Sequence, residues 1–147
     1  MKRADDLLLF LGRLAFAALF IPDGLSKVEN FARFAASLGH RGLAFPNLLA
    51  LGAVIAELGG SLLVLIGYYE ELGALLIIMF CIAANMLQHR YWEAPAAARN
   101  AAELQFYKNL ALCGGLLFLW VSGPGGWSVR RLLARESRKL SDISAAG

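Results

Sequence analysis

Apolar residues form four long runs along the chain, separated by short polar or glycine-rich breaks. Each run is close to the roughly 20 residues that an α-helix needs to cross the ~30 Å hydrocarbon core of a bilayer. Apolar positions are continuous within a run, which favours helices over barrel strands. The pattern predicts an all-α membrane four-helix bundle of antiparallel up-down topology with short interfacial helices, its spans covering 6–22, 45–67, 72–88 and 104–122.

The breaks predict where the spans end. Pro-Asp-Gly at 22–24 ends the first span, and Gly-Pro-Gly-Gly at 123–126 ends the fourth. The break at 68–71 is so short that the second and third spans must be antiparallel neighbours. Two amphipathic segments, 28–39 and 127–140, are predicted to lie in the membrane interface.

Composition supports a membrane protein. Of 147 residues, 59% are hydrophobic and only 17% charged, against about 25% charged in soluble domains. Disorder and a disulfide scaffold are excluded. The net charge of +3 comes mostly from the C-terminal end, so we expect membrane lipids, and no nucleic acid, as partners. The chain divides into a membrane bundle at 1–126 and a basic amphipathic cytoplasmic tail at 127–147.

The distribution of basic residues indicates an orientation. The N-terminal Lys2-Arg3 pair before an apolar run is similar to a signal peptide. Arg13 interrupts that run and no small-residue cleavage site follows, so we interpret it as a retained span. The dense basic tail close to a span end favours both termini on the cytoplasmic side. The predicted location is a bacterial-type inner (plasma) membrane, crossed several times.

Two charges lie within the predicted spans. At about 1.5 Å per residue, Arg13 lies roughly 10 Å and Glu57 roughly 15 Å from the inner ends of their spans. A lone charge at such depth is costly, so Arg13 and Glu57 are expected to form a buried ion pair. The pair could fix helix register or handle protons or substrate, and the sequence leaves both readings open.

A second polar group lies at the outer ends of three spans. Asparagine, lysine and histidine there are neighbours of aromatic residues, a composition typical of a small-molecule site and also of an ordinary interface belt. The expected walls are Phe20, Tyr91, Trp92, Phe106 and Tyr107. The ligand-binding candidates are Asp23, Lys27, His89, Lys108 and Asn109, with Asn85 close by.

Metal and thiol chemistry receive little support. His89 and His40 have no partner at ligand spacing, so no metal site is predicted. Cys81 and Cys113 form no Cys-x-x-Cys motif and are interpreted as small buried apolar residues.

Several short motifs together resemble the DoxX family of small four-helix membrane proteins. They are Leu-Gly-Arg-Leu at 11–14, Gly-Leu-Ser-Lys at 24–27, Glu-Leu-Gly-Gly at 57–60, Lys-Asn at 108–109 and Gly-Pro-Gly at 123–125. One departure is Ser-Val-Arg at 128–130, where family members often read Ser-Leu-Asp. The resemblance implies association with membrane redox systems, such as a subunit of archaeal thiosulfate:quinone oxidoreductase. It marks Arg13, Lys27 and Glu57 as characteristic positions.

The expected function is an integral membrane subunit of a redox-linked system that binds a quinone or similar lipophile at the outer face. No flavin, haem or iron–sulfur motif is present, so no intrinsic cofactor is expected and any redox centre would lie on other membrane or redox subunits. The chain would then be at most a redox-associated subunit. The alternatives are a structural or assembly subunit of a larger complex, and a small transporter. Transporters often contain broken helices, and the break at 22–24 is the only indication of one.

Overall fold

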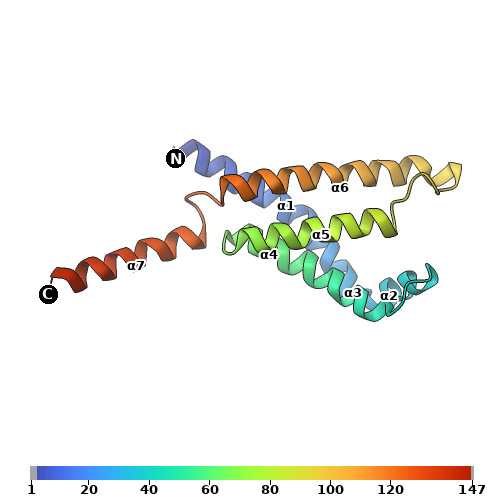
Figure 1. Cartoon of the computed structure of the whole chain (residues 1–147), viewed down its shortest axis with the longest axis horizontal. Helices are drawn as coiled ribbons and strands as arrows, with labels where there is room; N and C mark the ends of the chain where they lie inside the picture. Colours follow the sequence, from blue (N-terminus) through green and yellow to red (C-terminus); the bar gives the residue numbers. More distant parts are fainter. Residues whose placement is uncertain (1–2, 147) are drawn as a thin grey trace.

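A computed structural model describes residues 3–146, and all its regular elements within that range are helices (Figure 1). In chain order they are α1 (Arg3–Glu29), α2 (Phe31–His40), α3 (Pro46–Val54), the π-helical turn η1 (Ile55–Gly59), α4 (Gly60–Ile66), α5 (Glu70–Leu87), α6 (Ala96–Ser122) and α7 (Val129–Ala146). The all-α class is confirmed for the described residues.

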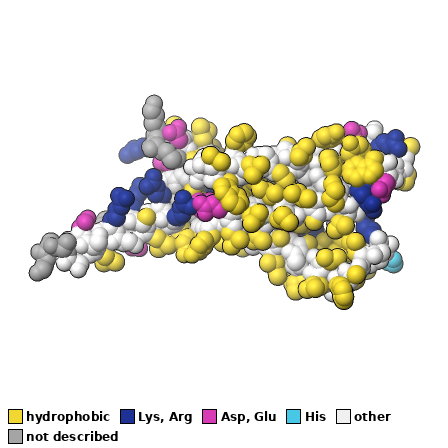
Figure 2. Space-filling model, in the orientation of Figure 1, with side chains coloured by type: hydrophobic (Ala, Val, Ile, Leu, Met, Phe, Trp, Pro, Cys, Tyr) yellow, Lys and Arg dark blue, Asp and Glu magenta, His cyan; other side chains and the backbone are white. Residues whose placement is uncertain are grey.

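Three helices are long and apolar enough to cross a membrane: Pro46–Ile66, which joins α3, η1 and α4, then Glu70–Leu87 and Ala96–Ser122. Figure 2 shows hydrophobic side chains as a broad band across the middle, with charged side chains gathered toward both ends and along α7. The helix α1 is not among the three, so a four-span bundle is not established by these helices.

The first helix does not end at the predicted break. The helix α1 continues through Pro22 to Glu29, so the predicted break of the helix at 22–24 is wrong. A proline removes one helical hydrogen bond and usually kinks or ends a helix. Here contacts beyond the proline hold the chain in place, because Gly24 packs on Leu58 and Lys27 bonds Glu57. The helix α6 also begins earlier than expected, at Ala96.

Glycines set how closely the helices approach. A Cβ on Gly24 of α1 would lie 2.6 Å from a methyl carbon of Leu58. Between α4 and α5, a Cβ on Gly60 would lie 2.9 Å from the carbonyl oxygen of Gly73. Any larger residue would therefore push these backbones apart. The contacts fix the register of α1 against α4 and of α4 against α5.

The core lies between α1, α4, α5 and α6, where Phe20, Val64, Ile77, Cys81 and Leu116 are buried together. The tight turn into α5 has left-handed backbone at Gly67 and Tyr69, so α4 and α5 are adjacent, as the short break predicted. The segment 28–39, predicted to be interfacial, contributes most of α2, whose Ala35 and Leu38 pack on Ala50 of α3. The helix α7 points away from the other helices (Figure 1).

Candidate functional site

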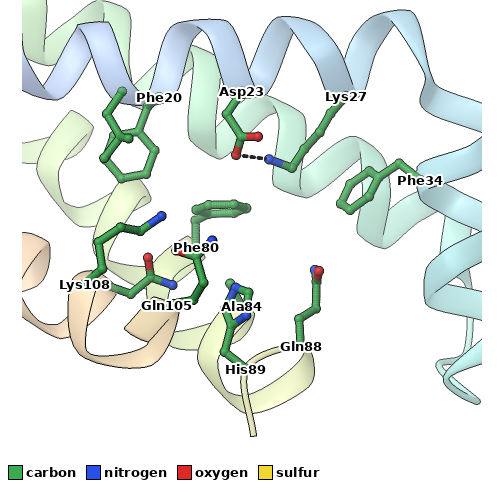
Figure 3. Close-up of a pocket in the computed structure, with 12 residues that line it drawn as sticks. Phe20, Asp23, Lys27, Phe34, Phe80, Ala84, Gln88, His89, Gln105 and Lys108 are labelled. Carbon is green, nitrogen blue, oxygen red and sulfur yellow. Dashed lines mark hydrogen bonds and ion pairs between the residues drawn. The ribbon is translucent and has the colours of Figure 1, made fainter. Parts of the chain in front are cut away.

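A cavity of about 400 Å³ lies between α1, α2, the C-terminal half of α5 and the middle of α6, and we call it the polar cavity (Figure 3). It is lined by Leu19, Phe20, Asp23, Lys27, Phe34, Phe80, Ala84, Gln88, His89, Gln105, Lys108 and Asn109. All five ligand-binding candidates from the sequence are among these residues. The structure brings them together around one space, from the helices α1 and α6 and the segment after α5.

The helix α1 supplies the acidic and basic pair of the cavity. Lys27 Nζ donates to Asp23 Oδ2 at 2.5 Å, one helical turn away. The ammonium also lies 5.3 Å from the ring centre of Phe80 and 5.8 Å from that of Phe34, distances at which the ring faces attract a cation. Because α1 continues past Pro22, Phe20 and Lys27 share one face, which a helix ending at the proline would not provide.

Lys27 also holds a buried carboxylate behind the cavity wall. Its Nζ donates to Glu57 Oε2 at 2.8 Å, and Glu57 is fully buried. The other oxygen, Oε1, has no hydrogen-bond partner among the described residues. Glu57 lies in the π turn η1, a kind of local distortion that is frequent at functional sites. The arrangement leaves one carboxylate oxygen available to accept a proton or a hydrogen bond.

The expected ion pair between Arg13 and Glu57 does not form. Arg13, only 1% exposed, donates instead to the carbonyl oxygen of Leu65 at 2.5 Å, and also to that of Trp127. Packing of Gly24 on Leu58 places Glu57 opposite the last turns of α1. Arg13 lies about 16 Å back along that helix, so the estimate of equal depth was wrong.

Arg13 belongs to a second group of charges, which we call the turn cluster. Its other members are Glu70, fully buried, and Arg130, whose Nη1 donates to Glu70 Oε1 at 2.5 Å. Asp6 accepts the backbone N–H of Gly126 at 2.6 Å. Nothing in the sequence distinguishes Glu70, because a glutamate pair in a short turn resembles ordinary solvated turn residues.

At the far wall, α5 and α6 are joined by polar side chains. Asn109 Nδ2 donates to Asn85 Oδ1 at 2.9 Å, and Asn85 donates to the carbonyl of Phe106. Burial lowers the pKa of His89, and the nearby charges of Lys108 and Arg41 lower it further. His89 is therefore neutral at pH 7 and can both donate and accept a hydrogen bond.

The aromatic walls differ from those expected. Only Phe20 of the predicted set lines the polar cavity, and Phe34 and Phe80 complete it. Tyr91 instead packs against Trp92, Phe106 and Tyr107 in a separate cluster. Phe80 could not be recognised from the sequence because it lies in an uninterrupted apolar run, where nothing distinguishes a cavity wall from a lipid-facing residue.

Long apolar helices with charges buried between them define an α-helical membrane protein. Residues 8–90, more than half of the chain, match the DoxX family model, and the chain belongs to this family. It is 30% identical over 139 residues to inner membrane protein YqjF of Escherichia coli K12, covering 92% of this chain and 99% of YqjF. It is 29% identical over 128 residues to inner membrane protein YphA of the same organism, covering 87% and 91%.

A more distant similarity extends to larger proteins. A Surfeit locus protein 4 homolog of Drosophila melanogaster is 32% identical over 130 residues, which cover 80% of this chain and 46% of that protein. No solved structure matches the chain.

Proposed function

We propose that the polar cavity binds the polar head of a lipophilic small molecule, a quinone or a close analogue, and that the protein is an integral membrane subunit of a redox-linked system. The observation that carries this proposal is the convergence of Lys27, His89 and Lys108 on one cavity of about 400 Å³ beside apolar walls. That volume falls within the range typical of small-molecule sites. A redox centre would come from a partner subunit.

The chemistry of the lining suits a head that accepts hydrogen bonds. Lys27 and Lys108 donate only, and neutral His89 can donate through one ring nitrogen. Quinone oxygens accept hydrogen bonds, and their negative charge grows on reduction, which the two ammonium groups would favour. Asp23, which lines the cavity, could take up a proton that a reduced head releases on reoxidation.

We further propose that α1 is a fourth span and that both termini are cytoplasmic, so the polar cavity opens at the outer face. The helix α1 has 27 residues, enough to cross a bilayer. The charges of Arg13 and Lys27 in this helix have partners: Arg13 donates hydrogen bonds to backbone carbonyls, and Lys27 forms an ion pair with Glu57. A buried charge with such partners costs far less than an isolated one.

The test is the amount of quinone that the protein binds. Lys108→Met should lower the amount of quinone bound per protein several-fold after mild-detergent purification. The melting temperature should stay nearly unchanged, because Lys108 is exposed and contributes little packing. Arg99→Met, an exposed position on the same helix that does not line the cavity, is the matched control.

Equal quinone in wild type and Lys108→Met, or none in either, would overturn the proposal. The structural or assembly subunit would then be the better interpretation. It has support in the apolar outer face of α6, where Phe118 and Val121 are among the most exposed side chains. The transporter alternative loses its only indication, since α1 is not broken at Pro22.

A further inference from the structure

A second cavity, of about 330 Å³, adjoins the polar cavity, and we call it the apolar groove. Both cavities are lined by Phe34, Phe80, Ala84 and Gln88. The remaining residues of the groove carry no charge and no polar side chain: Leu38, Leu48, Leu49, Gly52, Ala53, Ala56, Met79, Ala83 and Leu87. One continuous wall therefore has a charged space on one side and a hydrocarbon-like space on the other.

The groove exists because one helix offers small side chains there. Gly52 and Ala53 of α3 and Ala56 of η1 face Met79 and Ala83 of α5. A Cβ placed on Gly52 would meet no atom within 4 Å. These positions belong to two of the helices that are long and apolar enough to cross a membrane, so the groove lies between two candidate spans.

We infer that the ligand is a head-and-tail lipid, with its polar head in the polar cavity and a single flexible hydrocarbon tail in the apolar groove. This inference rests on the proposed function and adds the tail to it. The boundary lies at Phe34 and Phe80, since Lys27 contacts both rings from the polar side and the groove begins behind them. A tail of isoprenoid or alkyl type suits the uncharged lining of the groove, whereas a charged group does not.

The experiment compares two probes in phosphatidylcholine nanodiscs: a dimethoxy-methyl-benzoquinone without a tail, and the same head with a decyl tail. Gly52→Leu fills the groove and leaves the polar cavity untouched. We expect it to weaken binding of the decyl probe about tenfold, the usual scale of overpacking, and to leave the tail-less probe unchanged. Gly114→Leu is the matched control, because a Cβ there also meets no atom within 4 Å and Gly114 lines neither cavity.

Each outcome is informative. If Gly52→Leu binds the decyl probe as wild type does, the tail assignment is wrong while the head site stands. If neither probe responds to Lys108→Met, the proposed function itself fails. If Gly52→Leu is not monodisperse, Ala83→Leu is used in its place, because Ala83 lines the same groove from α5. Loss of the tail-less probe in either groove variant would also overturn the separation of head and tail sites.

Discussion

The two charge clusters along α1 share one motif but use it differently. Each contains a fully buried glutamate, Glu57 or Glu70, with one oxygen bonded to a cation from another helix and one oxygen without a partner among the described residues. In the turn cluster the cations are Arg13 and Arg130; at the polar cavity the cation is Lys27.

The two clusters differ in what their cations do: Arg13 joins backbone segments, whereas Lys27 lines a cavity. The planar guanidinium of Arg13 donates to carbonyls from two segments, so it joins α1 to the end of α4 and to the loop before α7. The ammonium of Lys27 is a flexible point charge that can change partners, and it stands beside a cavity. Buried charge in this protein is therefore structural where arginine bonds the backbone, and suited to a ligand where lysine lines a space.

The largest expected effect is on the turn cluster. Arg13→Met should lower the free energy of unfolding by about 3–5 kcal/mol, because it leaves the carbonyl oxygens of Leu65 and Trp127 without their donor and removes a cation that interacts with the buried Glu70 carboxylate. Thermal and denaturant unfolding in detergent would measure it. Arg33→Met, at an exposed position of α2, should change stability by less than about 0.5 kcal/mol. A similar small change for Arg13→Met would remove the distinction between the clusters.

The Lys27–Glu57 pair should come next. Lys27→Met strands a buried carboxylate and should cost about 3 kcal/mol. Adding Glu57→Gln should recover part of that loss, with a coupling of about 1–3 kcal/mol in a double-mutant cycle. Strictly additive losses would show that the 2.8 Å contact carries no net energy.

Arg130 should show a smaller effect, because its side chain is 49% exposed although it bonds buried Glu70. Arg130→Ala should cost about 1 kcal/mol and make α7 more sensitive to limited proteolysis. Arg131→Ala, an exposed neighbour on the same helix, is the control. Equal proteolysis of the two variants would mean that Arg130 does not hold α7 in place.

The smallest effect concerns pH and the polar cavity. The lowered pKa of His89 means that the folded protein binds its proton less readily than the unfolded chain. Stability from this residue is complete above the unfolded pKa of about 6.5 and is lost as pH falls below it. The melting temperature of wild type should therefore drop more between pH 7 and pH 5 than that of His89→Gln. Parallel pH profiles would show that His89 is not desolvated.

The sequence predicted the helical class, the tight turn before α5 and the polar residues Asp23, Lys27, His89, Lys108 and Asn109, which lie around one cavity. Those residues are polar side chains that border the apolar runs of the sequence, and the contrast makes them conspicuous. It could not predict the partner of Glu57, because depth counted from span ends ignores the sliding of one helix along another. The close approach at Gly24 decides that register, and a glycine in a Pro-Asp-Gly sequence looks like a turn until its neighbour Leu58 is known.

The π turn at Ile55–Gly59 has a consequence for the whole helix Pro46–Ile66. Before it, Gly52 and Ala53 line the apolar groove; after it, Gly60 packs on Gly73 of α5. A π turn accommodates one extra residue, and one residue of an α-helix corresponds to about 100° of rotation about the helix axis. The side chains before the turn are therefore rotated about the axis relative to those after it. Deleting a single residue here would restore a regular helix yet rotate the groove wall away from α5, with every side-chain type still in place.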